Sequence, residues 1–255
     1  VNRQDGFIGY GLKKDEFVCD CSELDNIITF RKDGKFVVTK IAEKTFVGKD
    51  IIHLNVWKKD DQRMVYNMIY LDAKSGKSMV KRYSVTSVTR DKEYDLTKGS
   101  EGSKELYFTA NPNGESEIVT VFLIQGCRAK KKVFDYDFSG LAIKGRGSQG
   151  NVLTKYPVKK IIQKSAGIST IGGRDLWFDE TIGRLNNDSR GKYLGNFNTD
   201  DLILVISRDG CYELTTHELI NRYDADNILI IEKFESPPLT PPKGGRTGKL
   251  LDPPR

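Results

Sequence analysis

The sequence has few of the residues on which most catalytic and metal sites depend. Its 255 residues include only two histidines, His53 and His217, and four cysteines, none of them in a C-x-x-C pair. Structural zinc sites need such pairs or clustered histidines, so we expect no metal. The cysteines form no disulfide framework, and reduced thiols are expected. With no nucleophile partnered to a histidine, no catalytic residue is predicted.

Long hydrophobic runs are also missing. No apolar stretch approaches the roughly 18 residues that a membrane-spanning helix needs, and no charged-then-apolar leader marks secretion. We therefore expect no membrane partner. The chain begins at Val1 rather than Met, in a segment already patterned as a strand, and we interpret it as a piece of a longer polypeptide.

Helical periodicity is almost absent, and a strand-turn-strand pattern takes its place. The best helical candidate is the short segment 215–221. Asp33-Gly34 lies between the β-rich runs 26–31 and 35–41, which is a strong hairpin signal because type I′ turns need positive φ. Residues 201–210 align with 25–34 without a gap and predict a second copy.

The same unit recurs between these two copies. Further hairpins are predicted for 63–71 with 77–85, for 117–124 with 128–136, and in a shorter form within 174–186. Strands are also expected at 6–10 and 16–20, and they could complete a sixth unit or close a ring. Repeats of 35 to 50 residues are typical of solenoids and propellers.

The strand cores 27–28, 118–124 and 202–206 are continuously apolar, which is typical of strands covered on both faces. From Ser236 the composition changes, since six of the eight prolines follow it. We therefore predict a β domain over residues 1–235 and a flexible, basic, Pro/Gly-rich tail over 236–255.

Positive charge is concentrated in one third of the chain. Residues 76–160 hold 16 Lys and Arg against 9 Asp and Glu, whereas residues 161–235 hold 8 against 13. A localised cationic surface is what binding to a polyanion requires. Lysines can also line a solvated sheet edge and prevent aggregation, which is the preferred explanation for any single lysine here. For the set as a whole, binding of duplex nucleic acid is the better explanation.

The basic residues occur in two settings. One is the strand that follows a hairpin turn, where alternation is expected to place Arg128, Lys130 and Lys132 on one face. The other is a glycine-rich loop, best developed at 144–150, with counterparts at 47–49, 98–102 and 190–192 at nearly even spacing. Glycines in such loops allow backbone amides to approach phosphate oxygens closely.

These motifs, together with Asp5-Gly6-Phe7-Ile8-Gly9 and Tyr156-Pro157-Val158-Lys159-Lys160-Ile161, resemble the C-terminal domain of the A subunit of bacterial type IIA topoisomerases. The resemblance covers about residues 2–234. It implies an all-β fold, a β-pinwheel of about five to six four-stranded blades with strand exchange between blades. It also implies that duplex DNA binds to, and bends around, a basic outer rim.

Within that family, the gyrase members carry a box of the form Q-R-R-G-G-K-G. No run of this form occurs here, which favours the topoisomerase IV type and leaves gyrase-type wrapping as the alternative. The implied partners are duplex DNA, the breakage-reunion domain of the same chain and the ATPase B subunit. No cofactor is expected in this fragment, because ATP and Mg²⁺ would belong to the holoenzyme. The implied location is cytoplasmic and nucleoid-associated.

Two other classes stay open, a propeller-type enzyme with catalysis in a central channel and a propeller that binds protein partners. For the DNA-binding interpretation, the predicted contact residues are Lys81, Arg82, Lys98, Arg128, Lys130, Lys132, Arg146, Gly147, Gln149, Gly150, Lys155, Lys159, Lys160, Arg190 and Lys192.

Overall fold

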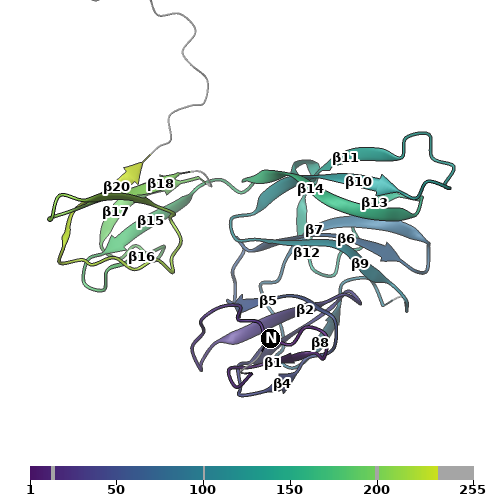
Figure 1. Ribbon diagram of the computed structural model, residues 1–255, viewed down its shortest axis with the longest axis horizontal. Coiled ribbons are helices and arrows are strands. Elements are labelled where there is room, and N and C mark those ends of the chain that lie inside the picture. The colour runs from purple at the N-terminus through teal and green to yellow at the C-terminus, as the bar shows by residue number, and fades with distance from the viewer. Residues whose placement is uncertain (13–14, 100, 199–200, 235–255) are drawn as a thin grey trace, which may run out of the picture. The chain divides into compact units, whose positions relative to one another are not determined.

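The computed structural model describes residues 1–12, 15–99, 101–198 and 201–234 (Figure 1). The tail predicted for 236–255 lies outside them. Within the described residues the regular structure is β-strand, apart from one 3-10 turn at Phe138–Gly140. The all-β prediction is therefore confirmed. The helical candidate at 215–221 is wrong, because a strand ends at Thr215 and a non-helical turn follows.

Five antiparallel hairpins recur along the chain, as the sequence predicts. They are β2 (Asn26–Arg31) with β3 (Lys35–Lys40), β6 (Val65–Asp72) with β7 (Lys77–Ser84), β10 (Glu115–Leu123) with β11 (Val133–Asp137), β15 (Arg174–Asp179) with β16 (Arg184–Asn186), and β18 (Leu202–Ser207) with β19 (Tyr212–Thr215). The turns of the first and last hairpins place Gly34 and Gly210 at positive φ, a conformation that glycine adopts without steric cost.

A return strand follows each hairpin and pairs with that hairpin's first strand. The return strands are β5 (Ile51–Trp57), β9 (Lys104–Asn111), β14 (Val158–Ser169), β17 (Lys192–Phe197) and β20 (Ile228–Phe234). One repeat is thus a hairpin, a connecting excursion and a return.

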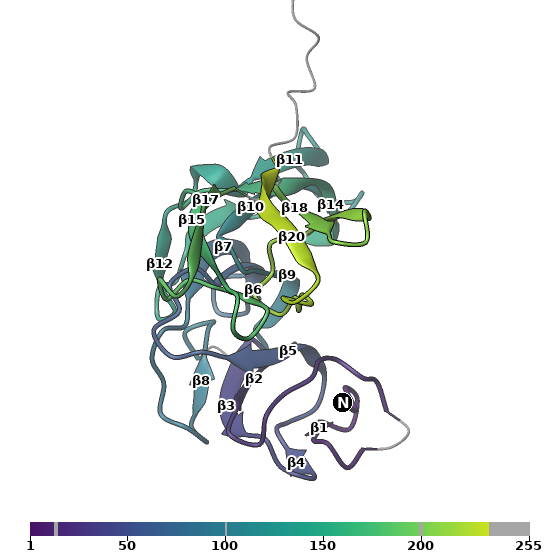
Figure 2. The same cartoon turned by 90° about the vertical axis from the view of Figure 1, so that its left-hand side faces the viewer.

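The excursion carries the strand exchange that the family resemblance implies. β8 (Glu93–Asp95) leaves the second repeat and pairs with β3 of the first, as Figure 2 shows. β13 (Asn151–Thr154) leaves the third repeat and pairs with β7 of the second, where β12 (Ile143–Gly145) adds a parallel strand. β4 (Thr45–Phe46) pairs with the N-terminal β1 (Phe7–Ile8). In the last repeat the exchange is reduced to a single bridge between Arg222 and Arg184.

Because the exchanged segments are short, the sheets contain two, three, four or five strands rather than a uniform four. The strand predicted at 16–20 is wrong, since those residues form no regular structure, and of 6–10 only Phe7–Ile8 is strand. The number of blades in a closed ring stays a prediction.

The described residues belong to two compact units, Val1–Ile171 and Gly172 onward. In the first unit three sheets stack face to face (Figure 1). Neighbouring residues of a strand enter different cores: Ile27 packs with Ile8, whereas Ile28 packs with Tyr66 of the next sheet. The middle sheet is covered on both faces, as its continuous burial shows.

The second unit contains one core between its two three-stranded sheets. Leu176 and Phe178 of β15 pack there against Ile203 and Val205 of β18. Apolar burial of this kind, at about 25 cal/mol per Å², is the main favourable term in folding.

Candidate nucleic-acid interface

Lys81 and Arg82 are not surface contacts, which corrects the sequence prediction for both. Each is 1 % exposed, because β7 is covered on both of its faces. Alternation along the strand sends Lys81 into the core shared with the first sheet and Arg82 into the core shared with the third. Neither side chain can neutralise a DNA phosphate from there.

Arg82 ties together three segments at the second interface. Its guanidinium donates to Asn67 Oδ1 at 2.9 Å, to the Gly114 carbonyl at 2.9 Å and to Thr170 Oγ1 at 3.0 Å. It also donates to the carbonyls of Phe138 and Leu141. Buried cations need such partners, so the role of Arg82 is to hold the second and third sheets together.

Lys81 has the corresponding role at the loop 146–150. Its ammonium donates to the carbonyls of Leu96 at 2.6 Å and of Arg146 and Ser148, both at 3.1 Å. It also lies over the ring of Tyr83, 4.7 Å from its centroid. Burial lowers the pKa of Lys81 to about 7. One buried cation thus brings together the segment before Lys98 and the loop of Arg146.

The glycine-rich loops do not occupy equivalent places in the repeat, contrary to what their spacing suggests. The loops at 47–49 and 98–102 follow the exchanged strands β4 and β8. The loop at 146–150 instead lies between β12 and β13, before the exchanged strand β13. The place equivalent to Lys98 in the third repeat is therefore taken by Lys155, which is exposed.

Arg146 is partly engaged within the protein. Its Nη1 donates to the Ser87 carbonyl at 2.6 Å, and its guanidinium lies 4.6 Å from the centroid of the Tyr94 ring. The neighbouring Lys144, on β12, is exposed and is missing from the predicted contacts. Its place in the sequence of this loop, two residues before Arg146, is the available signal.

The cations near the third hairpin lie in a loop rather than on a strand. β11 begins at Val133, so Arg128, Lys130 and Lys132 precede it, and the prediction that strand alternation aligns them is wrong. Arg128 and Lys130 are exposed or nearly so, whereas Lys132 bonds to the Gln125 carbonyl.

Lys159 and Lys160 lie on β14 and are both exposed. Consecutive strand residues point to opposite faces, so the two lysines cannot share a face. Lys160 lies over the Phe122 ring, 4.8 Å from its centroid. Cations held over aromatic rings in this way keep their charge at the surface.

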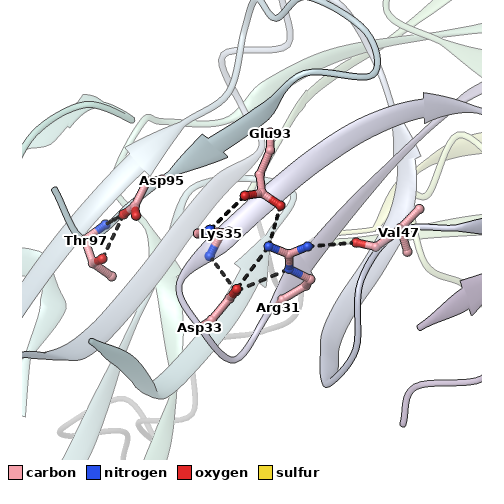
Figure 3. A network of polar contacts seen from close by, with 7 residues as sticks. All are labelled: Arg31, Asp33, Lys35, Val47, Glu93, Asp95 and Thr97. Carbon is pink, nitrogen blue, oxygen red and sulfur yellow. Dashed lines mark hydrogen bonds and ion pairs between the residues drawn. The ribbon is translucent and has the colours of Figure 1, made fainter. Parts of the chain in front are cut away.

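The first repeat shows how acidic residues neutralise cations beside a glycine loop (Figure 3). Arg31 donates to the Val47 carbonyl at 3.1 Å and pairs with Asp33 and Glu93. Glu93 also pairs with Lys35 at 2.8 Å. Lys49, which follows Gly48, projects from this loop as an exposed cation.

Arg190 and Lys192 belong to the second unit, and both are exposed. Arg190 pairs with Asp188 at 3.3 Å, and Lys192 donates to the Ile231 carbonyl at 3.0 Å. Their charges are therefore partly used within that unit.

Most of the remaining predicted contacts are accessible to a ligand. Lys98, Lys155, Lys159, Lys160, Arg190 and Lys192 are exposed, and the loop 146–150 lies at the surface. Among the described residues no group of three His, Cys, Asp or Glu side chains is arranged to hold a metal ion. No helix in the described part of the chain is long and apolar enough to span a membrane.

Comparison with known proteins adds a family to this geometry. A family model described as the topoisomerase C-terminal domain of Bacteroidota matches residues 1–166 and 184–238. The DNA topoisomerase 4 protein of Borreliella burgdorferi that corresponds to the A subunit is 24 % identical over 162 residues, which is 63 % of this chain and 24 % of that protein. The chain thus matches about a quarter of the length of this curated relative.

Two solved structures are similar at a lower level. The crystal structure of the C-terminal domain of DNA topoisomerase IV has a TM-score of 0.40 and 11 % identity, with 83 % of this chain and 79 % of that chain covered. The DNA gyrase A C-terminal domain has a TM-score of 0.28 and 13 % identity, with 91 % and 92 % covered. Superpositions this loose carry no argument about function.

Proposed function

Because the chain belongs to the family of topoisomerase C-terminal domains of Bacteroidota, we propose that it binds duplex DNA without sequence preference and bends it on the cationic loops of its first unit. The domain then presents the bound segment to the strand-passage core of a type IIA topoisomerase. In this role the domain is non-catalytic. ATP, Mg²⁺ and the cleavage chemistry belong to the breakage-reunion domain and to the ATPase B subunit.

The observation that carries the proposal is the convergence of two basic segments on one buried lysine. Lys81 bonds to Leu96, two residues before Lys98, and to Arg146, two residues after Lys144. Lys98 and Lys144 are both exposed. Bending a duplex over 20–30 base pairs costs on the order of 1–6 kcal/mol, which several phosphate contacts on one surface can offset.

We further propose that the parent enzyme is of the topoisomerase IV type, acting in decatenation and supercoil relaxation in the cytoplasm at the nucleoid. The absence of a Q-R-R-G-G-K-G run supports this choice over gyrase-type wrapping. A propeller-type enzyme is less well supported, because it would need carboxylates that converge from several repeats. In the first repeat the carboxylates of Asp33 and Glu93 instead pair with Arg31.

The test is fluorescence anisotropy of the chain with duplexes of about 10 and 40 base pairs over a salt series. The triple variant Lys98→Glu, Lys144→Glu, Lys155→Glu is expected to bind at least tenfold more weakly. Its log-log salt slope should fall by about one per lost contact. The wild-type chain should bind the longer duplex more tightly per site, because only that duplex can bend.

The matched control reverses three lysines at the opposite end of the first sheet from Lys98. Lys40, Lys58 and Lys59 are exposed and lie at the Asn26 end of β2, whereas Lys98 follows β8 near the hairpin turn at Gly34. Lys40→Glu, Lys58→Glu, Lys59→Glu makes the same change in net charge. An equal loss of affinity in both triple variants, or no binding at low salt, contradicts the proposal.

A further inference from the structure

The loop 146–150 is held in place from the inside by its own carbonyl groups. The carbonyls of Arg146 and Ser148 accept from Lys81 Nζ, and the carbonyl of Gln149 accepts from the Tyr70 hydroxyl at 2.7 Å. Three of the loop's peptide groups therefore turn their oxygens toward the protein interior.

In a trans peptide the N–H points opposite to the C=O, and the described chain contains no cis peptide bond. The N–H groups of Gly147, Gln149 and Gly150 belong to these three peptides, so they are directed away from Lys81 and Tyr70. Within the described part of the chain none of the three has a protein acceptor, whereas the intervening Ser148 N–H donates to the Gly145 carbonyl. Successive outward amides of this kind form a concave anion-binding site.

Glycine is required at the end of this loop. Gly150 has a φ of +83°, and a Cβ there would lie 2.3 Å from the Val80 carbonyl oxygen and 2.9 Å from Lys81 Cβ. The backbone can approach β7 closely enough to reach Lys81 only without a side chain at this position.

We propose that Lys81 is an internal clamp that shapes the loop 146–150 into a phosphate-binding site, in which the amides of Gly147, Gln149 and Gly150 hold one backbone phosphate of duplex DNA. This proposal rests on the proposed function for its ligand. Lys81 is a positioning residue and touches no DNA. The exposed Lys98 and Lys144 add positive charge beside the site, and the exposed Gln149 side chain adds a donor.

The clamp also makes the site sensitive to pH. Burial lowers the pKa of Lys81 to about 7, so the third N–H donor is lost in the mildly alkaline range. The charged groups that act on Lys81 are Lys98, which favours the neutral amine, and Asp95, which favours the ammonium. Tyr70 and Tyr83 also face Lys81, but burial raises the pKa of both, that of Tyr70 to about 12, so they stay neutral through this range. Affinity for DNA should therefore weaken as pH rises through neutrality.

The experiment is NMR of the ¹⁵N-labelled chain titrated with a duplex of about 12 base pairs and, separately, with inorganic phosphate. The amides of Gly147, Gln149 and Gly150 are expected to move downfield with both probes. The amide of Gly210 is the control, because it donates to the Ser207 carbonyl within a hairpin turn. Anisotropy on the same samples measures overall affinity.

Three variants separate positioning from simple stability. Lys81→Met should abolish the three shifts and weaken duplex binding roughly tenfold. Lys81→Arg, which stays charged, should retain binding and remove its dependence on pH between about 6 and 9. Gly150→Ala should displace the loop without altering the charge of Lys81, and it serves as the test if Lys81→Met does not fold.

The outcomes for this inference and for the proposed function are distinct. Normal duplex affinity with the three amides unmoved overturns the clamp and leaves DNA binding intact. Movement of the amides with phosphate, without any binding of duplex, supports the site and contradicts the proposed function. Retention of all three shifts in Lys81→Met also overturns the clamp.

Discussion

At the scale of single residues, burial decides what a basic side chain can do. His53 lies among the rings of Phe30, Tyr66 and Phe108, and its Nε2 is buried without a hydrogen-bond partner in the described part of the chain. Burial is the largest cause that lowers its pKa, to about 4, and the charge of Arg3 adds to the effect. A buried neutral histidine of this kind makes the fold sensitive to acid.

The sign follows from the two states. Between pH 6.5 and 4 the unfolded chain takes up a proton at His53 that the folded chain does not, so stability falls as pH falls through this window. His53→Phe should remove this contribution and gain about 2 kcal/mol relative to wild type on going from pH 7.5 to pH 4.5. Urea unfolding of both proteins at the two pH values measures the difference, and a constant gap contradicts the prediction.

Residue-scale prediction from the sequence is weakest for buried cations. Met79-Val80-Lys81-Arg82-Tyr83 contains the signal, since apolar residues flank both cations on both faces of the strand. The sequence still favours the surface for Lys81 and Arg82, because lysine and arginine are seldom fully buried. The carbonyl groups that make their burial possible come from segments 15 to 67 residues away, which a local pattern does not reveal.

At the scale of elements, close contact between strands gives a sharp test. Gly167 on β14 lies opposite a β-bulge with β10, and a Cβ there would lie 2.3 to 2.5 Å from backbone atoms of Ser116 and Glu117. Gly167→Ala should destabilise the chain by about 2 kcal/mol, because the two strands must separate. Gly126→Ala is the matched control, since no atom lies within 4 Å of its added Cβ. Similar urea midpoints for the two variants contradict the prediction.

The hairpins are predictable because their signals are local, a turn residue such as Gly34 between two β-rich runs. The exchanged strands are not placed by such signals. β8 has three residues and β4 has two, and their partners β3 and β1 lie in another repeat or at the N-terminus. The strand exchange itself is expected from the family resemblance alone.

At the scale of the whole molecule, charge is divided between the two compact units. Residues 1–171 hold 30 Lys and Arg against 21 Asp and Glu, whereas residues 172–255 hold 11 against 14. The proposed DNA contacts that survive the structural correction, apart from Arg190 and Lys192, belong to the first unit. Ligand binding stabilises only the cooperative unit that contains the site.

Calorimetry of the intact chain can therefore assign the DNA-binding surface to one unit. Two unfolding transitions are expected, because each unit has its own hydrophobic core. Duplex DNA at about 100 times its Kd should add about 2.7 kcal/mol to the first unit and raise its Tm by several degrees. The Lys98→Glu, Lys144→Glu, Lys155→Glu chain assigns the shifted transition, because it should lose that shift and keep both transitions. If duplex raises both transitions equally, the acidic unit contributes as much to binding as the basic one, and the division of function inferred from charge is wrong.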